Sequence, residues 1–251
     1  MRSLLLSFAL LAVAAPAAPA TFQDNMAQRT LACTNCHGSE GRAGPDGYYP
    51  RIAGKPAGYL YNQLLNFRDG RRHYGLMTGL LDTLSDPYLA EIAQHFASLD
   101  LPYPPPQRTA AAADVLQRGQ QITLQGDPDR RLPACAACHG TALTGVAPGV
   151  PGLLGLSRDY LNAQLGAWRT GQRRALAPDC MAEVARRLSP EDLSAVTSFL
   201  AAQPLPANPK AVAAQAAQPQ RKSRKVQPAA APEPPSMHCG AAPMPVAGAS
   251  R

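Results

Sequence analysis

The hexapeptide CTNCHG occupies residues 33–38, and a second copy, CAACHG, occupies residues 135–140. Each copy has two cysteines three residues apart and a histidine directly after the second cysteine. Residues at this spacing lie within about one helical turn, so both thiols and the imidazole can reach one bound group. The motif also occurs twice in a chain of only 251 residues, which points to a duplicated unit.

The sequences that follow the two copies match as well. Pro50 aligns with Pro151, Gly54 with Gly155, Tyr59-Leu60 with Tyr160-Leu161, Gln63-Leu64 with Gln164-Leu165, Phe67-Arg68 with Trp168-Arg169, Gly70 with Gly171, and Leu84-Ser85 with Leu188-Ser189. Agreement at this many positions, with only small insertions, indicates a duplicated domain of roughly 80 residues, a period too long for a solenoid. Residues 102–109 between the copies include four prolines and predict a stiff extended linker.

Within each copy the apolar residues follow a helical period. This pattern predicts helices over residues 59–67, 89–99, 114–122 and 193–200, and a weaker one over residues 22–31. Ser189-Pro190-Glu191-Asp192 has the features of a helix start, and no strand pattern is found. The sequence therefore predicts an all-α protein. Its divisions are a first domain at 21–101, the linker at 102–109, a second domain at 110–203, and a disordered basic tail rich in alanine and proline at 204–251.

The N-terminus has the layout of a secretory signal peptide. Arg2 precedes an apolar run from Leu4 to Ala15, and Ala18-Pro19-Ala20 offers a cleavage site. A membrane anchor is the competing interpretation, but the run is well short of the roughly 20 residues that span a bilayer. We therefore expect residues 1–20 to be removed and the protein to be exported to the periplasm.

Cys-X-X-Cys-His is the attachment signature of c-type haem. Cys33 and Cys36 would bind one haem through thioether bonds, and Cys135 and Cys138 a second. A redox-active dithiol needs a strand–helix context that is absent here, and the spacing of about 100 residues does not suit a zinc ribbon. Two covalent haems would also explain a low aromatic content of 6%, because each haem is itself a large apolar core element.

The expected iron ligands are a histidine and a methionine in each domain. His37 and His139 follow the cysteines directly, and Met77 and Met181 lie 40 and 42 residues further on. These two are the only methionines at matching positions of the repeat, and thioether ligation raises the potential and closes the iron to small ligands.

Three neighbouring features bear on these ligands. His73 has no histidine counterpart in the second copy and is a weak rival ligand, whereas Cys180, directly before Met181, could offer a thiolate. The carbonyls of Pro50 and Pro151 are candidates to accept the second N–H of the two histidines.

With these motifs the chain resembles the tandem dihaem cytochromes c of the cytochrome c4 type, over residues 22–202. The resemblance implies two class I cytochrome c domains with His/Met ligation. It further implies periplasmic electron delivery to a terminal oxidase or another reductase, with a quinol-oxidising complex as one source of electrons. The chain differs from that pattern in Cys180, in the loop at residues 141–148 and in the tail.

The net positive charge is concentrated in the tail and does not indicate a nucleic-acid-binding face. Of the net charge of +7, residues 201–251 supply six basic side chains against Glu233. We expect a solvated extension; the alternative is an arm that contacts an acidic partner or an anionic membrane surface. Met237-His238-Cys239 is a weak candidate for copper(I). Cys180 and Cys239, which the haem motifs do not use, could pair outside the cytoplasm.

The sequence thus favours an electron carrier that is not itself an enzyme. The alternative is a dihaem oxidoreductase, acting on sulfur compounds or peroxide, whose second haem is open or bound by the Cys180 thiolate. A third interpretation is an electron-conducting subunit that its tail holds within a respiratory complex.

Overall fold

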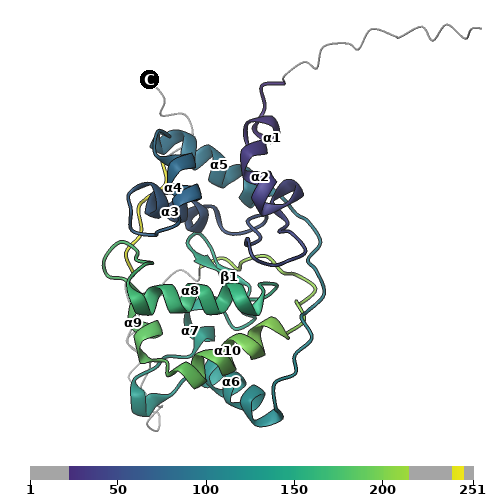
Figure 1. The fold of residues 1–251 in the computed structure, drawn as a ribbon, viewed down its shortest axis with the longest axis vertical. Helices are drawn as coiled ribbons and strands as arrows, with labels where there is room; N and C mark the ends of the chain where they lie inside the picture. Colours follow the sequence, from purple (N-terminus) through teal and green to yellow (C-terminus); the bar gives the residue numbers. More distant parts are fainter. Residues whose placement is uncertain (1–22, 215–238, 246–251) are drawn as a thin grey trace, which may run out of the picture.

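A computed structural model describes residues 23–214 and 239–245 of the protein (Figure 1). The expected signal peptide lies outside the described residues, as do residues 215–238 and 246–251 of the tail. Within the described part, no helix is both long enough and apolar enough to cross a membrane.

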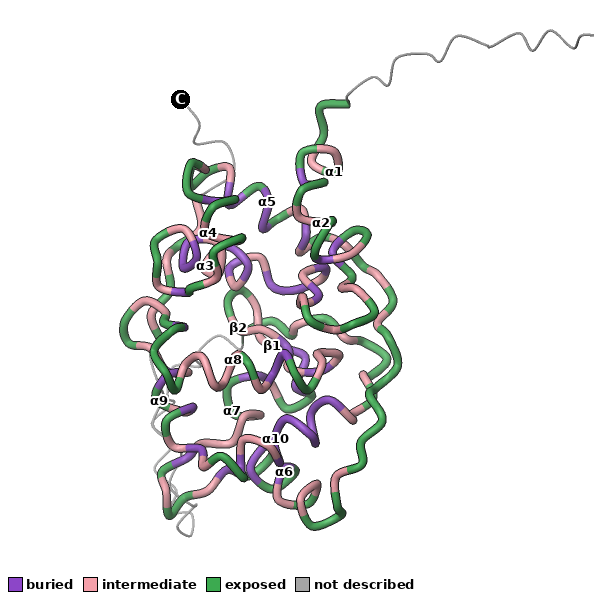
Figure 2. The backbone as a smooth tube through the Cα atoms, viewed as in Figure 1, coloured by how far each residue is buried: buried purple, intermediate pink, exposed green. Residues whose placement is uncertain are grey.

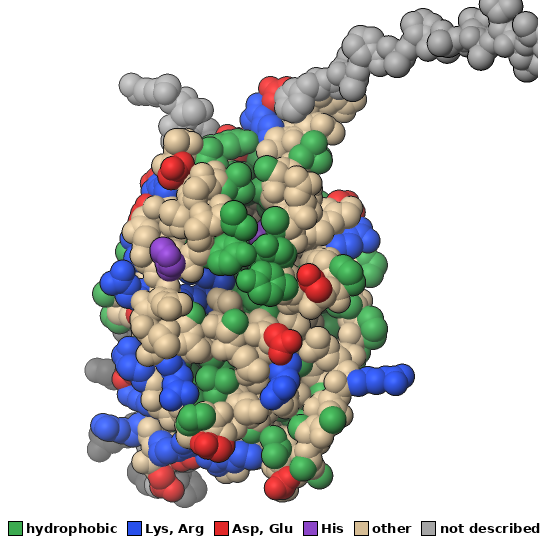
Figure 3. Space-filling model, in the orientation of Figure 1, with side chains coloured by type: hydrophobic (Ala, Val, Ile, Leu, Met, Phe, Trp, Pro, Cys, Tyr) green, Lys and Arg blue, Asp and Glu red, His purple; other side chains and the backbone are tan. Residues whose placement is uncertain are grey.

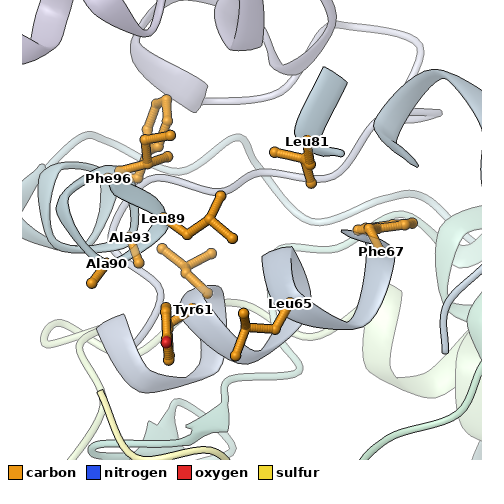
Figure 4. Packing of buried hydrophobic residues seen from close by; sticks show 10 residues of the cluster. Tyr61, Leu65, Phe67, Leu81, Leu89, Ala90, Ala93 and Phe96 are labelled. Atoms are coloured by element: carbon orange, nitrogen blue, oxygen red, sulfur yellow. The ribbon is translucent and has the colours of Figure 1, made fainter. Parts of the chain in front are cut away.

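The first half of the described chain is built from short helices around one apolar core. Its helices are α1 (Met26–Arg29), α2 (Leu31–His37), α3 (Ala57–Arg68), α4 (Gly75–Leu81) and α5 (Asp86–Ser98), with a 3₁₀ turn at Ser39–Gly41. The buried faces of α3 and α5 meet in this core, as Figure 4 shows for Tyr61 and Leu65 of α3 and for Leu89, Ala93 and Phe96 of α5. We refer to residues 23–101 as the first unit.

The second unit, residues 110–203, repeats this plan around a separate core. Its helices are α6 (Ala113–Gln125), α7 (Cys135–His139), α8 (Arg158–Thr170), α9 (Cys180–Arg187) and α10 (Pro190–Ala201). Helices α6 and α10 lie in close contact because residue 119 is glycine: a Cβ there would lie 2.2 Å from the carbonyl oxygen of Ala195. The most continuous burial in Figure 2 is along α10.

The helix-rich fold predicted from the sequence is confirmed. The four stronger predicted helices correspond to α3, α5, α6 and α10, and the Ser189 hydroxyl caps α10 by accepting from the Asp192 amide at 3.1 Å. The weaker prediction over residues 22–31 corresponds to two helices, α1 and α2, that meet at Thr30. A two-stranded antiparallel ladder, β1 (Gly145–Val146) with β2 (Val150–Pro151), was not predicted, because two-residue strands are too short to show alternation.

The linker at residues 102–109 has no helix or strand, as expected. Its start is held by the first unit, since the Arg51 guanidinium donates to the carbonyls of Leu101 at 2.5 Å and Pro102 at 2.9 Å. That guanidinium also stacks 3.9 Å from the centre of the Tyr103 ring. The linker's end is held by the second unit, where the Gln107 amide donates to the Ala201 carbonyl at 2.9 Å.

The two units contact each other through a reciprocal pair of arginines. Arg72 and Arg173 occupy equivalent positions and form an antiparallel bridge. Arg72 donates to the Gln164 side chain at 2.6 Å, and Arg173 donates to the Gln63 side chain at 2.9 Å. Each arginine therefore contacts the opposite unit's copy of one repeated glutamine, which gives the interface an approximate two-fold symmetry.

The described parts of the tail contact the helical units, which differs from the expected solvated extension. Val212 pairs with Val146 beside β1, and Lys210 forms an ion pair with Asp100 at 2.8 Å. Further on, Cys239 forms a disulfide with Cys180, and Ala242 exchanges two hydrogen bonds with the Asn62 side chain of α3, at 2.8 and 3.3 Å. Residues 239–245 therefore link the start of α9 in the second unit to α3 in the first. We call them the C-terminal strap.

Replacing both Cys180 and Cys239 with serine should destabilise the second unit. The disulfide joins residues 59 positions apart, and removing a cross-link of this kind costs about 2–4 kcal/mol. The double substitution avoids leaving a free thiol next to Met181. Urea unfolding followed by circular dichroism should show a lower midpoint, and Asn62→Ala, which weakens only the other end of the strap, should have a smaller effect. An unchanged midpoint in the double variant would show that the strap does not stabilise the fold.

Candidate haem-binding sites

Helix α2 presents the first Cys-X-X-Cys-His motif. The His37 ring is buried, and its Nδ1 donates to the Pro50 carbonyl at 2.8 Å. This hydrogen bond fixes the ring and leaves Nε2 as the nitrogen that can bind a metal ion. Burial lowers the pKa of His37, so the imidazole is neutral at neutral pH, which is the form that ligates iron.

Helix α7 presents the second motif in the same way. The His139 ring is buried, and its Nδ1 donates to the Pro151 carbonyl at 2.7 Å. Burial again lowers the pKa, and the imidazole is neutral. The expected proline carbonyl contact is thus confirmed in both units.

The four motif cysteines are not joined in disulfides. Cys33 and Cys135 are half-buried, while Cys36 and Cys138 are exposed. Burial raises the pKa of Cys135 to about 11, so its thiol is protonated. A redox-active Cys-X-X-Cys pair instead needs a lowered thiol pKa, and the environment therefore disfavours a dithiol catalyst.

The two methionines lie on short helices at equivalent places. Met77 is half-buried in α4 and packs against the first core, and Met181 is half-buried at the second position of α9. The start of α9 is held by Asp179, whose carboxylate accepts from the Ala182 amide at 3.0 Å and from the Ala175 amide at 2.7 Å. The iron-ligand roles of Met77, Met181, His37 and His139 stay predictions, as do the attachment roles of the cysteines.

The rival ligands are in unfavourable places. The alternative in which the Cys180 thiolate binds the second iron is contradicted, because the Cys180 sulfur is bonded to Cys239. His73 is exposed and lies at the contact between the two units, where its amide donates to the Gln172 carbonyl at 2.9 Å. A further histidine, His95, is not a rival ligand and lies in α5 with its ring against Phe96.

Buried cations at the interface fit the carboxylates of haem. Lys55, Arg72 and Arg173 are all less than a tenth exposed. Their partners are carbonyl, amide or hydroxyl oxygens, and none of the three forms an ion pair within the described residues. Buried charges are normally paired, so these residues suit the propionates that a haem brings. The buried Trp168 Nε1, which has no hydrogen-bond partner in the structure, is a further donor that fits such a group.

The surface around the first motif also fits a large apolar group. Apolar side chains gather on the face between α2 and α4 in Figure 3. The exposed large apolar residues of this unit are Leu31, Tyr48, Leu76 and Leu80, of which Leu31 lies on α2 and Leu76 and Leu80 on α4. These are the helices that carry the candidate ligands His37 and Met77.

The sequence analysis missed Lys55 and Trp168 as candidate functional residues. The repeat contained a sign of both, because each differs in residue type from the residue at the matching position of the other copy. Lys55 aligns with Leu156, and Trp168 aligns with Phe67.

The chain is similar in sequence and in fold to known proteins. A model of the Cytochrome c family matches residues 116–204. The chain is 38% identical to the thiosulfate dehydrogenase electron acceptor of Thiomonas intermedia, over 69% of this chain and 79% of that protein. It is 33% identical to cytochrome c4 of Pseudomonas aeruginosa, over 68% of this chain and 84% of that protein. The crystal structure of reduced cytochrome c4 from Pseudomonas stutzeri superposes with a TM-score of 0.61 at 30% identity, covering 70% of this chain and 96% of that one.

The fold and the two attachment motifs define a c-type cytochrome with two covalently bound haem c groups. More particularly, the chain belongs to the cytochrome c4 family of tandem dihaem cytochromes, and it functions in electron transfer.

Proposed function

We propose that this protein is a periplasmic carrier of single electrons, with one His/Met-ligated haem in each of two domains, at residues 21–101 and 110–203. The observation that carries the proposal is the repetition of the whole ligand set. Each unit has a buried, neutral histidine held by a proline carbonyl and a methionine on a short helix at the equivalent position. The haem supplies the one-electron chemistry.

The residues of this chain adjust each haem to carry electrons and not to bind substrate. The neutral imidazoles of His37 and His139, with Nδ1 already donated to a proline carbonyl, would hold each iron through Nε2. The thioethers of Met77 and Met181 would supply the second protein ligand of each iron, which would raise the potentials and keep small ligands out. The reciprocal contacts of Arg72 and Arg173 hold the two haem domains together, so that an electron can pass between them.

We infer a dehydrogenase of sulfur compounds as the electron donor. Support comes from the relative in Thiomonas intermedia, which is named as the electron acceptor of thiosulfate dehydrogenase. A terminal oxidase or another reductase then takes the electrons, and a quinol-oxidising complex is the alternative donor. The enzymatic alternative, in which this chain itself oxidises thiosulfate at an open iron, predicts a different kinetic result.

Stopped-flow spectroscopy separates the carrier from the enzyme. Ferric protein mixed with thiosulfate alone should stay oxidised. Addition of a catalytic amount of a thiosulfate dehydrogenase should reduce both haems, whereas dehydrogenase without thiosulfate should not. Rapid reduction by thiosulfate alone would overturn the carrier proposal and favour the enzyme. If the dehydrogenase does not reduce the haems but a quinol-oxidising complex does, the inferred donor is wrong and the carrier role stands.

A further inference from the structure

Lys55 extends from the first unit into the second. It lies just before α3, and its ammonium group donates to the Gly152 carbonyl at 3.2 Å. The residue is only 5% exposed. The start of α3 packs closely here, because the Tyr59 amide donates to the Pro148 carbonyl at 3.2 Å. A cation from the first unit is therefore buried against the backbone that follows β2 in the second.

This backbone is the one that orients the second proximal histidine. Gly152 directly follows Pro151, whose carbonyl accepts from His139 Nδ1 at 2.7 Å. The ammonium group of Lys55 thus contacts the residue next to the one that holds the His139 ring.

No Asp or Glu side chain among the described residues neutralises the charge of Lys55. Lys55 forms no ion pair in the part of the chain that the structure describes. Burial, followed by the charge of Arg51, lowers its pKa to about 8, so the side chain is still largely protonated at pH 7. A charge in a poorly solvated interior acts on its neighbours more strongly than one in water.

The two haem sites are unequal in this respect. Arg72 and Arg173 are repeated, one in each unit, and they form similar contacts. Lys55 is not repeated, because the equivalent residue of the second unit is Leu156, which packs in the second core. The first haem therefore has no counterpart of Lys55 reaching it from the other unit.

We propose that Lys55 sets the reduction potential of the second haem from across the domain interface. The proposal rests on His139 as the proximal ligand of that haem. Reduction adds an electron, and a nearby buried cation stabilises the reduced form, so Lys55 should raise the potential of the second haem. Lys55 should change the potential of the first haem less, because its ammonium group contacts the loop that follows β2 in the second unit.

The test is a spectroelectrochemical titration of the holoprotein and its Lys55→Gln, Lys55→Met and Lys55→Arg variants. A single-haem variant with Cys135 and Cys138 replaced by serine identifies the titration wave of the first haem. We expect the second wave to move to lower potential in Lys55→Gln and Lys55→Met, by more than the first wave moves. Lys55→Arg, which keeps the charge, should stay close to wild type.

Lys210→Gln is the matched control, because it removes the same positive charge from an exposed side chain. In the wild type that side chain pairs with Asp100. It should leave both waves almost unchanged. Equal shifts of both waves in Lys55→Gln, or no shift in either Lys55→Gln or Lys55→Met, would overturn the proposal. A wild-type protein whose second haem is not low-spin would instead contradict the ligand assignment. Failure of the Lys55 proposal and failure of the ligand assignment can therefore be told apart.

Discussion

Replacing Met181 with alanine should open the second haem to carbon monoxide and leave the first haem closed. If Met181 is the sixth ligand, its removal leaves an iron coordinated only by the porphyrin and His139 within the protein. The ferric second haem should then lose the methionine–iron charge-transfer band and become high-spin or bind water. The ferrous form should bind one carbon monoxide per chain, where the wild type binds none.

The same substitution should lower the potential of the second haem. Thioether ligation favours the ferrous state, and the choice of axial ligand is among the factors that spread haem potentials over about 0.8 V. The shift should therefore be clear in a redox titration, and the first wave should move little, because Met77 lies on a separate helix in the other unit.

Met77→Ala is the matched control, since Met77 occupies the equivalent place in the first unit. It should open the first haem only, and the double variant should bind two carbon monoxide molecules. Wild-type protein that already binds carbon monoxide, or that has one high-spin ferric haem, would contradict His/Met ligation and support the enzymatic alternative. An unchanged spectrum in Met181→Ala would show that another residue ligates the second iron.

Replacing Cys135 and Cys138 with serine should produce a protein with one covalent haem. The wild-type mass should exceed that of the processed polypeptide by two haem groups, because each unit has its own pair of cysteines. The variant should lose one haem mass and keep the optical spectrum of the first haem. Intact-mass spectrometry and extraction with acidic acetone measure this directly, since thioether-bound haem stays with the protein.

The reciprocal variant, with Cys33 and Cys36 replaced by serine, should keep only the second haem. Because the core of each unit is separate, the unit that keeps its motif should still attach haem. Loss of both haems from either variant would show that the units cannot bind haem independently. A wild-type protein that carries a single haem mass would contradict the assignment of one of the motifs.

Local patterns in the sequence predicted most of the helical framework and the candidate site. Apolar residues at helical spacing predicted α3, α5, α6 and α10, because burial of one helix face leaves a periodic trace in the chain. The repeat selected Met77 and Met181 by comparing two copies of one fold. The contacts of His37 with Pro50 and of His139 with Pro151 were also foreseen, since they lie within 13 and 12 residues and occur in both copies.

Only the tertiary structure decided the features that join distant segments. The pairing of Cys180 with Cys239 connects residues 59 positions apart, and the contact of Lys55 with Gly152 connects residues 97 positions apart. The sequence offered the disulfide only as a possible pairing of the two cysteines that the haem motifs do not use, and it gave no indication of the Lys55 contact, because neither feature has a repeated counterpart. The position of the strap likewise depends on distant partners: the disulfide to Cys180, the hydrogen bonds to Asn62, and the packing of Ala242 and Met244 against the first core. Periodicity shows which face of a helix or strand is buried. Which residues that face contacts in a distant segment depends on how the whole chain packs.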